Sequence, residues 1–320
     1  MSAFLNKIIN ENCLSGLKNI PDGIIDCCIS SPPYWGLRDY GHDEQLGSEE
    51  NFEDFISKLI EIYTEIKRVL KPDGTCFINL GDTYGGSGSG TTKNADTKKY
   101  IENSKQIYVL PNGTAKASKF RGTALNKSLL MIPERFAIEM INMGWILRNT
   151  IIWHKPNQMP SSATDRFTVD FEKIFFFVKQ QKYYFEQQLE PISDISLKRA
   201  EYGWNGKVME SGHASGGIKP MDKMGSRFAN PEGRNMRTVW SVNTNGYSGV
   251  HFATYPEKLV ERMLKAGCPK DGIVLDPFMG AGSTAVVARK LGMNFTGFEL
   301  NKKYFDMANE RLYKEIGMFL

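Results

Sequence analysis

Apolar residues along the chain fall into two patterns: short continuous runs, and longer stretches in which they recur at helical spacing. Runs rich in β-branched residues are typical of buried strands, and helical spacing is typical of helices that bury one face. The runs predict strands at residues 7–10, 24–29, 75–80, 145–153, 172–178, 183–185, 272–277 and 294–300. The helical spacing predicts helices at residues 52–70, 129–143, 256–266, 283–291 and 302–314.

The order of these segments predicts the fold class. Strands alternate with helices at both ends of the chain, which is typical of an α/β protein with a doubly wound, mostly parallel Rossmann-like sheet. Residues 172–178 and 183–185 are expected to pair antiparallel at the sheet edge, and residues 71–74 to end the helix before them. We expect residues 1–190 and 248–320 to form one domain, with residues 191–247 as an inserted segment of low regularity.

Positive charge is concentrated in two polar segments of a chain whose net charge is only +4. Residues 84–128 hold eight Lys or Arg against two Asp or Glu, and residues 197–237 hold eight against four. Two basic segments on an acidic remainder favour a polyanion as the binding partner. The alternative is a pair of solvated loops with no ligand.

Composition limits the classes of function. Five cysteines without CxxC spacing and four widely separated histidines predict neither a disulfide framework nor a metal site. We find no apolar run long enough to span a membrane and no signal-peptide pattern at the start. These features lead us to expect a cytoplasmic protein without a membrane partner.

A polar and aromatic motif, Ser30-Ser31-Pro32-Pro33-Tyr34-Trp35, follows the predicted strand at residues 24–29. The two prolines stop the strand, fix the backbone and lack N–H groups, so nearby carbonyls stay available as acceptors. Rigid acceptors beside aromatic rings suit the exocyclic amino group of a stacked base. A proline-rich turn with core aromatics is the alternative interpretation.

A second motif, residues 273–284, reads as a strand, a glycine loop and a helix N-terminus. Gly280 and Gly282 allow close approach of a ligand, while Ser283 and Thr284 can cap the helix, whose N–H groups favour an anionic group. Glu299 ends the next strand, where an acidic side chain binds ribose hydroxyls in nucleoside-binding folds. Because Ala285 is permitted at its position in a dinucleotide loop, an NAD-linked oxidoreductase stays open.

Together the two motifs resemble the signature pair of S-adenosylmethionine-dependent DNA amino-methyltransferases. The catalytic motif comes first and the glycine loop last, which is the order of the β group of that family. Residues 153–157 with 165–168 and Glu172 resemble the stretch after its central strands, and residues 251–256 resemble its methionine-side cofactor motif. The resemblance covers the chain apart from the basic loop and residues 191–247.

The resemblance implies a target-recognition role for residues 191–247, with S-adenosylmethionine as cofactor and double-stranded DNA as partner. It implies a catalytic set of Ser31, Pro32, Pro33 and Tyr34 that holds a flipped base. The implied cofactor set is Asn12, Ser30, His251, Tyr255, Pro256, Asp276, Phe278, Gly280, Gly282, Ser283, Thr284 and Glu299. The DNA-binding candidates are Lys98, Lys99, Lys105, Arg166, Arg199, Arg227, Arg234 and Arg237.

Individual roles follow from the same resemblance. Asp276 would face the methionine ammonium group and Glu299 the ribose, while Asn12 replaces a more usual aspartate beside the adenine amino group. Serine at the first motif position favours cytosine N4 as the methylated atom, with adenine N6 as the alternative. A catalytically silent DNA-binding relative is a further alternative for the function. The sequence also leaves open whether the protein forms a homodimer and whether it has a cognate restriction endonuclease as a partner.

Overall fold

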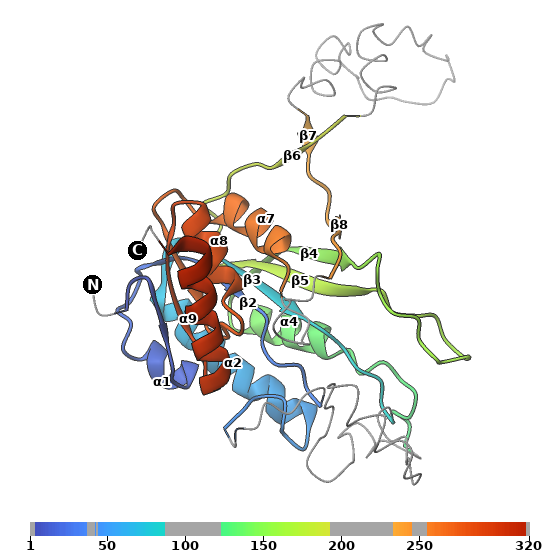
Figure 1. Ribbon diagram of the computed structural model, residues 1–320. Coiled ribbons are helices and arrows are strands. Elements are labelled where there is room, and N and C mark those ends of the chain that lie inside the picture. The colour runs from blue at the N-terminus through green and yellow to red at the C-terminus, as the bar shows by residue number, and fades with distance from the viewer. Residues whose placement is uncertain are drawn as a thin grey trace, which may run out of the picture. The chain divides into compact units, whose positions relative to one another are not determined.

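A mixed sheet of eight strands forms the centre of the larger of two compact units (Figure 1). The computed structural model describes residues 4–36, 42, 44–86, 123–192, 233–244 and 255–317. The larger unit comprises Met1–Phe185 with Thr238–Leu320, and the smaller comprises Glu186–Arg237. The central sheet is therefore assembled from both ends of the chain, as the sequence predicts.

The strand order is β1-β10-β9-β2-β3-β5-β4-β8. These strands span β1 Lys7–Ile9, β2 Ile25–Ser30, β3 Leu70–Leu80, β4 Ile146–His154, β5 Phe171–Val178, β8 Val239–Ser241, β9 Ile273–Asp276 and β10 Asn294–Phe298. All neighbours pair in parallel except β5, which is antiparallel to both β3 and β4. The mostly parallel α/β sheet predicted from the sequence is confirmed.

Helices cover the two faces of this sheet (Figure 1). They span α1 Cys13–Leu17, α2 Phe52–Val69, α4 Ile132–Asn142, α7 Glu257–Gly267, α8 Ser283–Lys290 and α9 Lys302–Ile316. Helices α1, α2 and α4 pack together on one face, and α7, α8 and α9 on the other. No helix among the described residues has the length and apolarity needed to cross a membrane.

The sequence of α2 explains both its helical form and its position. Phe55, Leu59 and Ile66 recur at helical spacing and are fully buried against the sheet. Acidic residues occupy its first turn and basic residues its last, which complements the helix dipole. Removing this apolar stripe from water is the main favourable contribution to docking α2.

Two local predictions are wrong. Residues 183–185 form no strand, and β5 lies inside the sheet rather than at its edge. Tyr183 and Phe185 instead pack their rings against Phe176, with centroids 5.8 Å away in each case. Helix α2 does end at Val69, just before residues 71–74 as the sequence predicts, and these residues then belong to β3, where the pairing with β2 shifts register.

The smaller unit contains a short antiparallel pair formed by β6 (Leu189–Glu190) and β7 (Arg234–Asn235). Glu190 accepts hydrogen bonds from Nε of Arg234 at 2.9 Å and from Nε of Arg237 at 2.6 Å. Strand β8 follows this unit and pairs with β4 in the central sheet. Part of the segment that the sequence analysis set apart, residues 238–244, therefore belongs to the larger unit.

Candidate active site

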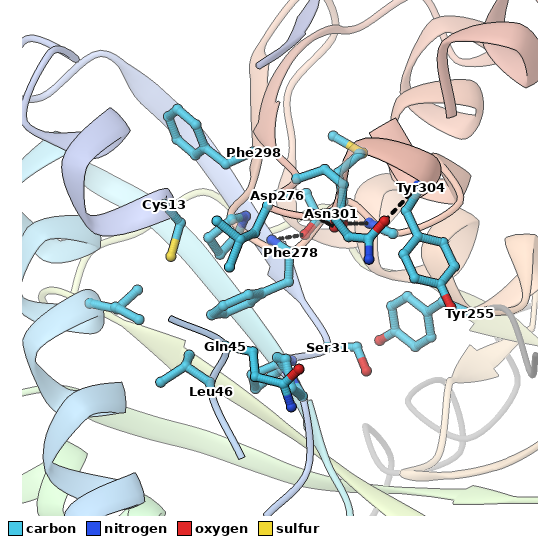
Figure 2. A pocket seen from close by; sticks show the side chains of 18 of the residues that line it. Cys13, Ser31, Gln45, Leu46, Tyr255, Asp276, Phe278, Phe298, Asn301 and Tyr304 are labelled. Carbon is cyan, nitrogen blue, oxygen red and sulfur yellow. Dashed lines mark hydrogen bonds between the residues drawn. The ribbon is translucent and has the colours of Figure 1, made fainter. Parts of the chain in front are cut away.

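A cavity of about 620 Å³ opens at the carboxyl ends of the parallel strands β2, β3, β9 and β10. Ligands of open α/β sheets bind at this edge, because the loops that leave the strands converge there. The first motif enters the cavity after β2, the glycine loop after β9, and Glu299 after β10. Figure 2 shows Ser31, Asp276, Phe278 and Tyr255 around this cavity.

The glycine loop is held by Asp276 at the end of β9. One of its oxygens accepts from the Thr284 hydroxyl at 2.5 Å, and the other accepts from the Phe278 amide at 3.0 Å. Gly280 and Gly282 have φ of +54° and +80°, a region that favours glycine. A Cβ on Gly280 would meet nothing closer than the Phe278 carbonyl oxygen at 3.9 Å, so the loop leaves room for a ligand.

The prediction that Ser283 and Thr284 cap α8 is wrong, because Gly282 is the N-cap residue and no side chain caps the helix. The Thr284 hydroxyl turns to Asp276, and the Ser283 hydroxyl accepts from Arg311 at 3.0 Å. Both side chains therefore stabilise the loop. Both also line the cavity.

Glu299 connects β10 to the glycine loop. Its two oxygens accept from the amides of Gly280 and Asn301, each at 2.8 Å. Burial raises the pKa of Glu299 to about 7 and that of Asp276 to about 6. No lysine or arginine of the described chain pairs with either carboxylate. A buried carboxylate, Asp276, and a half-buried one, Glu299, beside an open cavity fit a ligand that brings a cationic group and hydroxyl groups of its own.

Asn12 lines the same cavity from the start of α1. Its side-chain oxygen, which the sequence analysis assigned to the adenine amino group, accepts from the Leu14 amide at 2.9 Å and caps α1. The group that Asn12 offers to a ligand is therefore chiefly its side-chain NH₂. Phe278 adds an aromatic ring to the cavity wall.

The catalytic motif joins the cavity through Ser31, Pro32, Pro33 and Tyr34, all of which line it. The Ser31 hydroxyl accepts from the Asn79 side-chain amide at 3.5 Å. Ser30, in contrast, is fully buried, bonds to the Tyr63 hydroxyl and does not line the cavity. Ser30 therefore anchors the end of β2 rather than facing a cofactor.

A polar network fixes the Tyr34 side chain. Its hydroxyl donates to Glu172 Oε2 at 2.7 Å and accepts from Asn79 Nδ2 at 2.5 Å. The same Asn79 amide donates to Glu172 at 2.7 Å, and Lys155 forms an ion pair with Glu172. Burial, with a further effect of the Glu172 charge, raises the pKa of Tyr34 well above its usual value. The tyrosine is therefore neutral and its ring is held in one orientation.

Two residues that position Tyr34 were not identified from the sequence. Asn79 is a polar residue in an otherwise apolar strand end, which is a signal that could have been used. Gly81 lies against Tyr34 so closely that a Cβ on it would come within 2.5 Å of the ring. Glu172 and Lys155 were noticed only as parts of a resembling stretch.

Of the other predicted site residues that the structure describes, only some line the cavity. Tyr255 lines the cavity and packs edge-on against Trp153, whereas Pro256 caps α7 and does not line it. Arg166 lies on an exposed loop, with its guanidinium 4.0 Å from the Tyr84 ring centroid. The remaining candidates His251, Lys98, Lys99, Lys105, Arg199 and Arg227 lie outside the described residues.

Comparison with known proteins finds relatives of this chain. The family model of N6/N4 DNA methylases matches residues 25–310. The type II methyltransferase M.SmaI of Serratia marcescens is 36% identical over 310 residues, covering 96% of this chain and 91% of that protein. The type II methyltransferase M.Cfr9I of Citrobacter freundii is 37% identical, covering 96% and 88%.

Solved structures share the fold at low sequence identity. The PvuII DNA methyltransferase, described as cytosine-N4-specific, superposes with a TM-score of 0.60 at 15% identity, over 99% of this chain and 95% of that chain. A putative DNA modification methylase from Thermus thermophilus, solved with S-adenosyl-L-methionine, gives 0.56 at 20% identity, over 96% and 93%.

The fold and the site thus define a DNA methyltransferase of the amino-methylating class. The chain belongs to the family of N6/N4 DNA methylases. The NAD-linked alternative is therefore set aside.

Proposed function

We propose that this enzyme transfers a methyl group from S-adenosylmethionine to N4 of a cytosine flipped out of duplex DNA. The observation that carries the proposal is that the Ser31–Tyr34 motif and the Asp276–Gly282 loop line one cavity. A base bound at the first motif and a cofactor bound at the second would share that space. Under this proposal, residues 186–237 contribute to target recognition.

The cofactor side of the cavity fits S-adenosylmethionine by its chemistry. Asp276 would interact with the ammonium group and Glu299 with the ribose hydroxyls, while the bare backbone of Gly280 allows close contact. Phe278 and Asn12 would bracket the adenine ring. When bound, the cofactor supplies an electrophilic methyl group on a sulfonium centre.

The base side of the cavity prepares the amino group. That nitrogen is a poor nucleophile because its lone pair is delocalised into the ring. The Ser31 hydroxyl and the Pro32 carbonyl would accept its two hydrogens out of the ring plane, so that the lone pair can point at the methyl group. Tyr34 would stack on the base, which stabilises the flipped state by about 1–3 kcal/mol. The rate then depends on positioning and on local electrostatics.

The choice of cytosine depends on Ser31. In the resembled family, Ser-Pro-Pro-Tyr goes most often with N4-cytosine and Asp-Pro-Pro-Tyr with N6-adenine. Both bases present the same kind of amino group, so adenine N6 is the outcome that would revise the proposal. A restriction–modification setting, with a cognate endonuclease and a cytoplasmic location, is part of the same proposal.

Tritium transfer from labelled S-adenosylmethionine to DNA tests the activity. Mass spectrometry of the digested nucleosides then distinguishes N4-methylcytosine from N6-methyladenine. Long-read sequencing of DNA from an expressing host gives the modified site. N6-methyladenine alone would overturn the cytosine assignment, and no transfer to any DNA would overturn the proposed function.

Ser31→Ala tests the catalytic motif directly. Loss of a polar group that meets the reacting atom lowers the rate on the order of 10²–10³ at comparable sites. We expect that loss in methyl transfer, with binding of S-adenosylhomocysteine nearly unchanged by calorimetry. Turnover within a few-fold of wild type would remove Ser31 from the mechanism.

A further inference from the structure

The loop between β4 and β5 holds two large apolar side chains in water. Phe167 is 96% exposed and Met159 is 79% exposed. Both are more exposed than any other large apolar residue that the structure describes. Phe167 is flanked by Arg166 and Thr168, and the same stretch of loop holds Asp165, Asp170 and the partly exposed Val169. An aromatic ring that projects into water from a mostly polar loop is suited to insertion between stacked bases.

This loop starts and ends at the active-site cavity. Lys155 at its start and Glu172 after its end both line the cavity, and the Lys155 amide donates to the Asp170 carbonyl at 2.7 Å. Asn157 exchanges two hydrogen bonds of 2.9 Å with the backbone of Thr244, another cavity residue. In Figure 1 the loop extends from β4 and β5 away from the sheet.

The outer part of the loop is fixed to the ends of the basic segment. Lys127 pairs with Asp165 at 2.6 Å, and Arg166 lies 4.0 Å from the Tyr84 ring centroid. Tyr84 and Lys127 lie at the start and near the end of residues 84–128, which carry a strong excess of lysine and arginine. Phe167 thus belongs to a loop that runs from the cavity to contacts with Tyr84 and Lys127, the described ends of a segment whose lysines suit phosphates.

We propose that Phe167 inserts into the DNA duplex where the target base leaves the stack. The inference rests on the proposed function, since only an enzyme that flips a base creates such a gap. Phenylalanine and methionine are among the side chains that wedge between base steps. Flipping breaks the pairing and stacking of the target, and an aromatic ring stacked on the remaining bases offsets that loss.

The test compares two duplexes that contain the mapped site. In one the target base is paired normally, and in the other it faces an abasic position, so that flipping needs less energy. We expect Phe167→Ala to lower kcat/KM on the paired duplex by roughly 5- to 150-fold, the range of one aromatic stacking contact. On the abasic duplex the loss should be about 3-fold or less, and Phe167→Trp should retain activity on both.

Tyr313→Ala is the matched control, because Tyr313 is an aromatic residue of α9 that is 70% exposed. It should leave both rates unchanged. Equal losses on the two duplexes would overturn the wedge, because the ring would then contact the flipped base or the phosphates. Unchanged rates in Phe167→Ala would also overturn it, as would a shift in oligomeric state by sedimentation velocity. If the wild type transferred no methyl group to any DNA, that result would instead contradict the proposed function.

Discussion

At the scale of single residues, Asp276 and Glu299 determine how cofactor binding responds to pH. Burial raises their pKa values to about 6 and about 7, so both protonate as the pH falls through that window. The ammonium group assigned to Asp276 requires an ionised carboxylate there, and the ionised form of Glu299 is the stronger acceptor for ribose hydroxyls. We therefore expect affinity for S-adenosylhomocysteine to fall between about pH 7.5 and 5, by up to about tenfold per pH unit for each carboxylate that must ionise. Titration calorimetry over a pH series measures this.

Glu299→Gln supplies the comparison for that series. The variant removes the group with the higher pKa, so the remaining pH dependence should move toward the lower window of Asp276. Calorimetry of the wild type in buffers of different ionisation enthalpy should also show proton release on binding near pH 6. An affinity that is level across the range would contradict the assignment of these carboxylates.

Single residues also show what the sequence could predict about the site. Ser31 and Glu299 were found because each stands in a motif with a fixed place after a strand. Asn79 and Gly81 were missed because their roles depend on β3 lying beside β2, which no local pattern determines. Ser30 was placed wrongly because its side chain turns to Tyr63 instead of the cavity.

At the scale of elements, side chains of β3 and β5 converge on the Tyr34 hydroxyl, and Lys155, which follows β4, pairs with the β5 carboxylate. We expect Tyr34→Phe and Glu172→Gln each to lower kcat by roughly 10-fold, because the first removes the hydrogen bond to the Glu172 carboxylate and the second leaves that bond without its charged acceptor. The double variant should lose little more than either single one, since contacting residues are not additive. Single-turnover methyl transfer measures the rates, and calorimetry should show unchanged S-adenosylhomocysteine binding.

Glu134→Gln is the control for that cycle. Glu134 lies on α4 and pairs with Lys173 on β5, outside the cavity, so it makes the same change of charge on an ion pair that has no part in the network. Wild-type rates are expected for it. Additive losses in the double variant would show that Glu172 and Tyr34 act separately.

The secondary-structure elements also show why individual helices and strands were predicted better than the order of the strands in the sheet. Helix α2 and strand β2 were predicted within a residue or so because their periodicity is local. The position of β5 was not, because a buried apolar run such as residues 174–178 fits an edge hairpin or a central strand equally well. Packing across the whole sheet determines which strands pair. The rings of Tyr183 and Phe185 pack against Phe176, and residues 183–185 form no strand.

At the scale of the whole molecule, two basic segments are available for one polyanion, and we expect them to act differently. Residues 84–128 are rich in lysine and glycine, which suits contact with phosphates without sequence selection. Arg234 and Arg237 belong to the smaller unit and share the Glu190 carboxylate, so their guanidinium groups are ordered near one another. Arginine binds guanine edges bidentately, which suits base recognition.

Neutralising Lys98, Lys99 and Lys105 together should weaken binding to all DNA alike. If all three contact phosphates, the log–log salt dependence should flatten by about 0.9 per lost contact, or roughly 2.7 in total. Arg234→Ala or Arg237→Ala should instead reduce discrimination between cognate and mismatched sites, by about 1–3 kcal/mol for each lost bidentate contact.

Glu190→Gln is the control that distinguishes an effect of net charge from an effect on base recognition. It raises the net charge while keeping both arginines, so it should strengthen binding to every duplex. Equilibrium binding of cognate and scrambled duplexes over a salt series measures all three effects. Should the lysine variant lose specificity while the arginine variants lose only general affinity, the two segments have the opposite roles.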